Sequence, residues 1–492
     1  MSIVSIPFLF LFFPITLGLY YLIPCKNSMT LRNILLLLVS LFFYAWGEPI
    51  RVFLICTLII INWLLGMWVS GKKSTKYGKW IVFIAVIVNA GTLFFYKYLN
   101  FTLGNIGLLI GTELPSFNFI LPLGLSFFCF QAISYVVDIY RGKCKSSKNL
   151  LNAALYLSIF FKITQGPITQ YNQFESQITE RKTTWSVFCD GMWRFALGIA
   201  KKALIATNVA YIVTAIFDAD YSTLPVMSAW LGCFAYMIQV FFDFDGYSDM
   251  AIGLGKMFGF ELPENFNYPY MATSVTEYWQ RWHISLGSWF RDYMFYPLTL
   301  GPAVRMRKRL AKKNVSRNTA KLIQNIFVTG IIWFTTGFWH GASWNYILWG
   351  LINGIFVIWE LYKKPLKNKR LNNFLGWSYA IAVAFFTKAL VHTSDMTSAG
   401  SFYGAMFGLH GNCFFDATTL FYLKEYWMFL LIGVLASFPI YTKLKERFVK
   451  PEATALQTIL SLVETIALCL VFVISIAYLF KNGFTAFVYQ KF

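Results

Sequence analysis

The run VFLICTLIIINWLLGMWV, from Val52 to Val69, is 18 residues long and contains no charged side chain. A helix of about 18 residues is long enough to cross the ~30 Å hydrocarbon core of a bilayer. Because unpaired backbone groups inside lipid are costly, and because the apolar residues are continuous rather than alternating, the run predicts a spanning helix and not a barrel strand. Similar runs recur from Ile3 to Leu22, Ile81 to Tyr96, Phe327 to Trp339, Trp344 to Trp359, Trp427 to Ile440 and Leu460 to Leu479.

This repetition predicts an all-α, polytopic membrane protein with roughly ten to twelve transmembrane or re-entrant helices. Composition agrees, because 57% of the 492 residues are hydrophobic and only 13% are charged, against about 45–50% and about 25% in soluble domains. The run from Ile3 to Leu22 lacks a basic lead-in and a small-residue cleavage site. It therefore predicts a retained span rather than a signal peptide.

The formal net charge of +20 comes from basic residues in short segments between apolar runs. Such clusters are typical of the cytoplasmic side of a membrane protein, so we expect a multi-pass membrane protein and no nucleic-acid partner. Eight cysteines are scattered without paired spacing, which indicates neither a metal site nor a disulfide framework. The basic clusters are Lys72 to Lys79, Arg141 to Lys148, Arg305 to Lys321, Lys363 to Arg370 and Lys443 to Lys450.

The middle of the chain, about residues 130–350, differs from both ends. Polar and ionisable residues, glycine and proline appear there in segments that are still too apolar for soluble loops. Because polar groups inside a membrane are costly, this density predicts a functional cavity. We found no clear internal repeat, and we expect residues 1–492 to form a single domain with its core motifs in this region.

His340 lies in FTTGFWHGASWNYILWG, residues 334–350, between two apolar runs that have basic clusters at their outer ends. The two runs predict a helical hairpin with His340 at its tip. A desolvated imidazole stays neutral and can accept a proton, as a general base must. A histidine that hydrogen-bonds between helices, or one at the lipid interface, is the alternative interpretation.

His283 lies in SVTEYWQRWHISLGSWFRDYMFYPL, residues 274–298, which predicts one unusually polar helix from about Thr276 to Tyr296. Glu277 and Arg281 are four residues apart and fall on one face of such a helix. The segment indicates a re-entrant or amphipathic helix that lines a cavity. An interfacial helix with an aromatic belt is the alternative.

Three carboxylates, Asp243, Asp245 and Asp249, follow an apolar run. Their spacing does not fit a calcium loop, and an aspartate pair that binds a metal is a weak signal, so no metal site is predicted. We expect these carboxylates to cap helices or to pair with Arg281 and Arg291 inside the bundle.

The basic stretch from Arg305 to Lys321 predicts a loop with two alternative roles. It anchors the protein against anionic lipid, or it docks an acidic carrier protein or the phosphates of a coenzyme A thioester. The docking residues would be Arg305, Arg307, Lys308 and Arg309.

Six ordered blocks in the middle of the chain resemble the membrane-bound O-acyltransferase family, in particular its bacterial alginate O-acetyltransferase-like branch. They are FQAISYVVDIYRG, GPITQYNQF, FDFDGYSDMAIGLGKMFGF, PENFNYPY, EYWQRWHISLGSWFRDY and TGFWHGASWNYILWG, and they begin at residues 130, 166, 242, 263, 277 and 336.

The resemblance implies a protein of a bacterial cytoplasmic membrane, with helices around a polar tunnel, that transfers an acyl group from a thioester to a hydroxyl. It implies that His340 and His283 are the catalytic histidines. Donors for an oxyanion would come from Arg281, Trp282 or Asn345. Asp249 and Glu277 would orient polar groups of the cavity.

We therefore expect an acyltransferase that moves an acetyl group from a cytosolic thioester, acetyl-CoA or an acyl carrier protein, to an extracytoplasmic polysaccharide. No bound cofactor is expected, and a separate extracytoplasmic transferase would complete the reaction. One alternative is D-alanyl transfer from a carrier protein toward teichoic acid. A second is a lipid or polysaccharide transporter, which would place its polar segments in two symmetric halves.

Overall fold

The computed structural model describes residues 1–24, 29–448, 454–482 and 487–488. Within these residues the chain is helical, and the only β-pairing is a single antiparallel bridge between Phe266 and Trp282. The all-α class predicted from the sequence is confirmed. Lys450, the last residue of a predicted basic cluster, lies outside the described residues.

Nine helical stretches of the described chain are long and apolar enough to cross a membrane, and Phe8–Leu22 is a shorter apolar helix. The prediction of a polytopic membrane protein is therefore confirmed, although fewer helices meet this length criterion than the ten to twelve segments expected. The nine stretches are Met29–Gly47, Arg51–Ser70, Lys76–Ile110, Trp185–Phe217, Val226–Met257, Arg317–His340, Lys369–His392, Ala417–Ala436 and Gln457–Lys481.

The chain folds as two compact units. Of the described residues, the first unit comprises those of Met1–Ile199 and Tyr247–Glu264 and those from Leu479 onward, and the second comprises those of Ala200–Gly246 and Asn265–Tyr478. The expectation of one domain over residues 1–492 stays a prediction. Helices that begin in the first unit are η1 (Phe8–Phe12), α1 (Phe13–Leu22), α2 (Met29–Gly47), α3 (Arg51–Ser70), α4 (Lys76–Leu93), η2 (Phe94–Tyr98), α5 (Leu99–Ile110), α6 (Leu125–Arg141), α7 (Leu150–Ser158), α8 (Phe160–Ile163), α9 (Tyr171–Thr179) and α10 (Trp185–Ala200).

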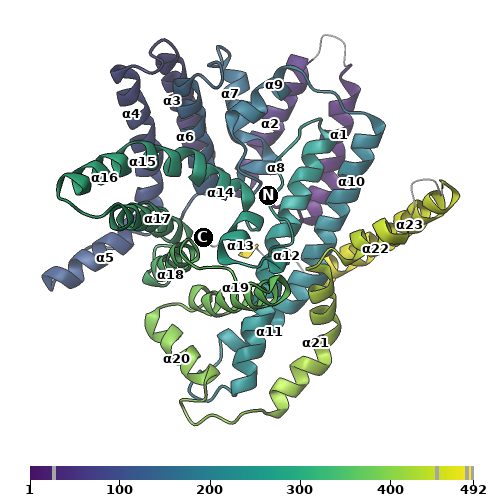
Figure 1. Cartoon of the computed structure of the whole chain (residues 1–492). Helices are drawn as coiled ribbons and strands as arrows, with labels where there is room; N and C mark the ends of the chain where they lie inside the picture. Colours follow the sequence, from purple (N-terminus) through teal and green to yellow (C-terminus); the bar gives the residue numbers. More distant parts are fainter. Residues whose placement is uncertain (25–28, 449–453, 483–486, 489–492) are drawn as a thin grey trace. The chain divides into compact units, whose positions relative to one another are not determined.

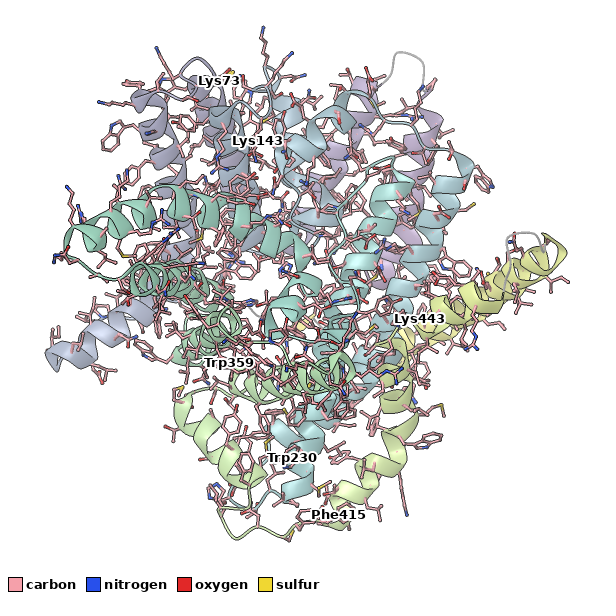
Figure 2. The ribbon with its side chains drawn as sticks, viewed as in Figure 1. Lys73, Lys143, Trp230, Trp359, Phe415 and Lys443 are labelled. Carbon is pink, nitrogen blue, oxygen red and sulfur yellow. The ribbon has the colours of Figure 1, made fainter. Side chains whose placement is uncertain are left out.

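In the first unit, α6 is buried along nearly its whole length and packs against α3 and α4. The amides of Asn62 on α3 and Asn89 on α4 donate to each other at 3.1 and 2.7 Å, so each buried polar group meets a partner. Lys73 and Lys143, from two predicted cytoplasmic clusters, lie at the same end of this unit (Figure 2). That placement agrees with a single basic face.

Most helices of the second unit follow the long α12 (Val226–Met257) in the chain. In Figure 1, α17, α18 and α19 lie side by side, and α17 and α18 form a tightly packed hairpin. The remaining helices that begin in this unit are η3 (Lys201–Ala206), α11 (Thr207–Phe217), η4 (Pro269–Met271), α13 (Val275–Arg281), α14 (Ile284–Phe290), η5 (Arg291–Phe295), α15 (Tyr296–Leu300), α16 (Pro302–Lys312), α17 (Arg317–His340), α18 (Trp344–Glu360), α19 (Lys369–His392), α20 (Met396–Met406), α21 (Ala417–Ala436), α22 (Ile440–Phe448) and α23 (Thr454–Asn482).

Two predictions about this unit are wrong. The helix expected from Thr276 to Tyr296 is broken at Trp282 and His283, because this part of the backbone pairs with Phe266 instead of continuing α13. The stretch from Arg305 to Lys321 is not a loop, since it lies largely in α16 and the first turn of α17. Its alanine, leucine, methionine, lysine and arginine side chains are good helix formers.

Candidate active site

His340 is the last residue of α17, at the tip of the α17–α18 hairpin, as the sequence predicted. Two glycines let the helices approach closely. A Cβ built on Gly337 would lie 2.3 Å from the carbonyl oxygen of Tyr346, and one on Gly350 would lie 2.3 Å from that of Trp333. Because a side chain at either position would clash with backbone, the close contact at these glycines determines where His340, at the end of α17, lies relative to α18.

The ring of His340 is buried among aromatic side chains. Only 5% of the residue is exposed, and its ring lies edge-on to Trp349 at a centroid distance of 4.9 Å. The ring of Trp339 is 4.7 Å away on the same helix. The imidazole therefore lies in an apolar setting, in which polar interactions are stronger than in water.

His283 reaches this region from the break between α13 and α14. Its φ of 49° lies in the left-handed region, which is uncommon for a residue other than glycine. Main-chain hydrogen bonds hold the turn, because Asn267 N–H donates to the Arg281 carbonyl at 3.0 Å and Ile284 N–H donates to the Asn265 carbonyl at 2.9 Å. An unusual φ at a site supported from both sides is typical of functional positions.

The two histidines share one neighbour, Trp339. The ring centroid of His283 is 6.2 Å from that of Trp339 and 4.7 Å from that of Phe244 on α12. His283 is 2% exposed and lies outside the nine candidate spans, and burial lowers its pKa to about 3. The imidazole of His283 is therefore neutral at physiological pH.

Arg281 and Glu277 form an ion pair at 2.9 Å across one turn of α13. Arg281 also donates from Nη1 to the carbonyl of Asn267 at 3.0 Å, and Glu277 accepts from the backbone and hydroxyl of Thr273. Both side chains therefore brace the segment that carries His283. The candidate oxyanion donor Trp282 is the neighbour of His283 in the chain and is fully buried.

Asn345, another candidate oxyanion donor, lies in the first turn of α18 and is buried. Its amide Nδ2 donates to the carbonyl oxygen of Thr393 at 3.0 Å and to the hydroxyl of Thr393 at 3.2 Å. These two bonds tie α18 to the end of α19. The amide N–H groups of Asn345 therefore point to Thr393 in this structure.

The expected partners of the three carboxylates are wrong. Asp243 pairs with Lys202 at 2.5 Å and Asp245 pairs with Lys201 at 2.5 Å, both within the second unit. Residues two apart on a helix point in different directions, so each aspartate on α12 takes one of the two successive lysines of η3. Asp249 lies in the first unit.

Each arginine named in the sequence analysis has a nearer partner. Arg281 pairs with Glu277 on its own helix, and Arg291 pairs with the adjacent Asp292 at 3.1 Å. In the first unit Asp249 accepts a hydrogen bond from Arg194 at 2.9 Å. Across the described part of the chain, no three histidine, cysteine or carboxylate side chains gather into a metal-binding group.

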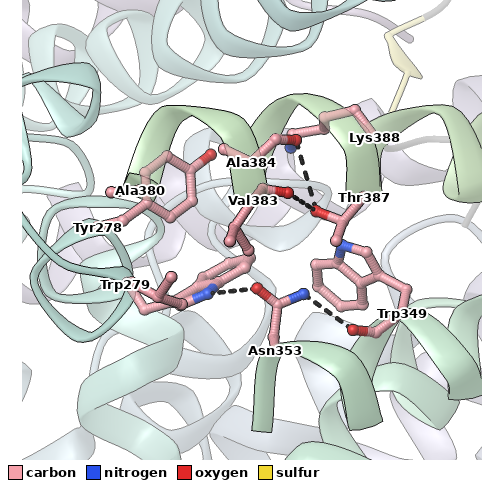
Figure 3. Close-up of a pocket in the computed structure, with 10 residues that line it drawn as sticks. Tyr278, Trp279, Trp349, Asn353, Ala380, Val383, Ala384, Thr387 and Lys388 are labelled. Carbon is pink, nitrogen blue, oxygen red and sulfur yellow. Dashed lines mark hydrogen bonds between the residues drawn. The ribbon is translucent and has the colours of Figure 1, made fainter. Parts of the chain in front are cut away.

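Residues of α13, α18 and α19 line a small pocket with room for about one water molecule (Figure 3). Trp349, the neighbour of His340, lines it, and the amide of Asn353 links Trp279 (3.0 Å) to the backbone of Trp349 (2.8 Å). Lys388, on α19, contributes the cation of the pocket wall and places its ammonium 4.1 Å from the ring centre of Trp282.

Sequence reasoning missed Lys388, Asn353 and Asn265. The signal for Lys388 was available, because a lysine in the apolar run of α19 is costly and marks a functional position by default. A larger pocket of about 620 Å³, lined mainly by apolar side chains of α18, α19 and α20, shares Val383 and Thr387 with the small one.

The basic residues proposed for donor docking lie on α16, a helix that carries neither His283 nor His340. All four side chains are exposed, so they are accessible to an acidic partner. They are Arg305, Arg307, Lys308 and Arg309.

The chain is similar in sequence to several known proteins. A model of the membrane-bound O-acyltransferase family matches residues 145–393, a range that contains both His283 and His340. The chain is 35% identical to the probable alginate O-acetylase AlgI of Azotobacter vinelandii, covering 81% of this chain and 77% of that protein. It is 28% identical to the peptidoglycan O-acetyltransferase of Helicobacter pylori, covering 82% and 79%. It is 27% identical to the teichoic acid D-alanyltransferase of Streptococcus thermophilus, covering 64% and 74%.

Proposed function

This chain belongs to the membrane-bound O-acyltransferase family, and from that membership we propose that it moves an acetyl group from a cytosolic thioester toward the hydroxyls of a cell-surface polysaccharide. It is a multi-pass bacterial membrane protein and an O-acyltransferase. The acetyl group is favoured because two groups of similar proteins, the alginate O-acetylases and the peptidoglycan O-acetyltransferase, are named for it. Because the family is one of acyltransferases, we propose acyl transfer and not the transport of a lipid or polysaccharide.

In the proposed reaction, the acceptor hydroxyl attacks the thioester carbonyl. A new C–O bond forms and the C–S bond breaks, while neutral His340 takes the hydroxyl proton and returns it to the leaving thiolate. The observation that carries this proposal is the burial of both His340 and His283 against Trp339 in one aromatic cluster. A desolvated site strengthens interactions with the oxyanion that forms on the carbonyl.

The donor is proposed to be acetyl-CoA or an acetylated carrier protein, held on the cytosolic side by the exposed cations of α16. Both donors are acidic, which suits a basic helix. We propose no bound cofactor. A separate extracytoplasmic acyltransferase would receive the acyl group and complete the transfer to the polysaccharide.

The test measures ester-linked groups released by mild base from the surface of a deletion strain. The strain is complemented with wild-type protein, His340→Ala or His410→Ala at matched membrane levels. His410 is an exposed histidine and serves as the control. Loss of acetate with His340→Ala alone would support the proposal. Loss of D-alanine instead would favour the teichoic acid alternative, which the Streptococcus relative motivates, and an unchanged ester profile would overturn transfer through His340.

A further inference from the structure

One side chain, Asn265, fixes the hydrogen bonding of the His283 ring. Its Oδ1 lies 3.1 Å from Nδ1 of His283, 2.8 Å from the hydroxyl oxygen of Ser285 and 3.2 Å from the backbone nitrogen of Ser285. All three residues are buried. The amide of Asn265 therefore forms the centre of a small polar group within the aromatic cluster.

The orientation of this amide follows from its partners. A backbone N–H can only donate, so the atom facing Ser285 N must be the carbonyl oxygen of Asn265 and not its nitrogen. A carbonyl oxygen has no proton to give. The Nδ1 atom of His283 must then carry the proton that is shared with Asn265, because the other tautomer would set two lone pairs against each other.

We propose that Asn265 is a positioning residue that holds His283 in the tautomer protonated at Nδ1, which leaves the Nε2 lone pair as an acceptor for the transfer reaction. A neutral imidazole has a single N–H, so fixing it at Nδ1 determines the role of Nε2. The catalytic consequence rests on the proposed acyl transfer. The tautomer itself does not depend on it.

The backbone supports this role without the amide side chain. Ile284 N–H donates to the main-chain carbonyl of Asn265, and Phe266 pairs with Trp282, so the turn at His283 has main-chain anchors on both sides. A change at the Asn265 side chain is therefore expected to alter the ring and its tautomer before it alters the fold. A neighbouring group that orients a catalytic imidazole in this way has a large effect on rate in other enzymes.

Nitrogen NMR tests the tautomer directly. The chain has only four histidines, so protein labelled with ¹⁵N-histidine and held in lipid nanodiscs gives few ring signals, and His283→Gln identifies those of His283. Between about pH 6 and pH 8 we expect a protonated Nδ1 and an unprotonated Nε2 in the wild type. Ser285→Ala should keep this pattern, because it removes a different donor, whereas Asn265→Leu should lose it. A wild-type His283 protonated at Nε2 would overturn the proposal.

Kinetics test the consequence. Asn265→Ala is expected to lower kcat by about 10- to 100-fold with little change in KM for the thioester. Asn265→Asp keeps an acceptor for Nδ1 but adds a charge that favours the imidazolium form. It should therefore introduce a loss of activity as pH falls, which the wild type lacks over the same range. Full activity of Asn265→Ala would overturn the positioning role. Absence of acyl transfer by the wild type would instead overturn the proposed function and leave the NMR result standing.

Discussion

The close packing of α17 on α18 gives a sharp prediction for Gly337→Ala. The added Cβ would lie 2.3 Å from the carbonyl oxygen of Tyr346, whereas ordinary contacts begin near 3.4 Å, so the helices must separate by about 1 Å. Overpacking of this kind costs about 1–3 kcal/mol, and alanine recovers about 1 kcal/mol over glycine in a helix. We expect a net loss in free energy of unfolding of about 0–2 kcal/mol.

Activity should respond far more strongly than stability. His340 lies three residues beyond Gly337, and a displacement of about 1 Å at a reacting group can cost roughly 10²-fold in rate. Gly330→Ala on the same helix is the matched control, because nothing lies within 4 Å of its added Cβ. The assay is surface ester content together with the unfolding temperature in detergent. Equal ester content in the two variants would refute the claim that glycine packing sets the position of His340.

Three further predictions test other parts of the second unit. Asp243→Asn removes the carboxylate that pairs with the ammonium of Lys202, and should lower the free energy of unfolding by about 3–5 kcal/mol. Adding Lys202→Met should restore most of the lost unfolding temperature. A double variant as unstable as Asp243→Asn would argue against a simple ion pair. Lys388→Met should leave the unfolding temperature unchanged or higher, because it removes a buried charge. It should reduce transfer by more than about tenfold, because the pocket wall loses its cation. Full transfer by this variant would make Lys388 a packing residue. Changing the four exposed cations of α16 to glutamine should raise KM for the thioester in inverted vesicles, most strongly at low salt, with kcat unchanged; a salt-independent KM would exclude electrostatic docking.

Much of the fold could be predicted because it depends on local sequence. Apolar runs with basic ends identify the spanning helices, and they were sufficient to place His340 at the tip of the α17–α18 hairpin. The identity of α16 as a helix was also available locally, but the density of charge led to the prediction of a loop. Good helix formers with apolar residues at helical spacing were the better signal.

The predictions that were wrong concern contacts between residues distant in the chain. The break before His283 exists because the backbone of residues 265–267 bonds to the backbone of residues 281–284, and periodicity within residues 276–296 carries no trace of that partner. The carboxylate pairs failed for the same reason, since Lys201 and Lys202 are about 40 residues from Asp243 and Asp245. A sequence shows which charges need partners in lipid, but it does not show which partners they find.

The two histidines are held by different kinds of interaction, and this difference makes their roles separable by experiment. His340 depends on the backbone approach of two helices at Gly337, where no side chain can be added without displacement. His283 depends on a hydrogen bond from its ring to Asn265, on a turn that the main chain already supports. Gly337→Ala should therefore move His340 and leave the tautomer of His283 unchanged, whereas Asn265→Leu should do the reverse. If either variant changed both properties, Trp339, which contacts both rings, would be transmitting the change between them.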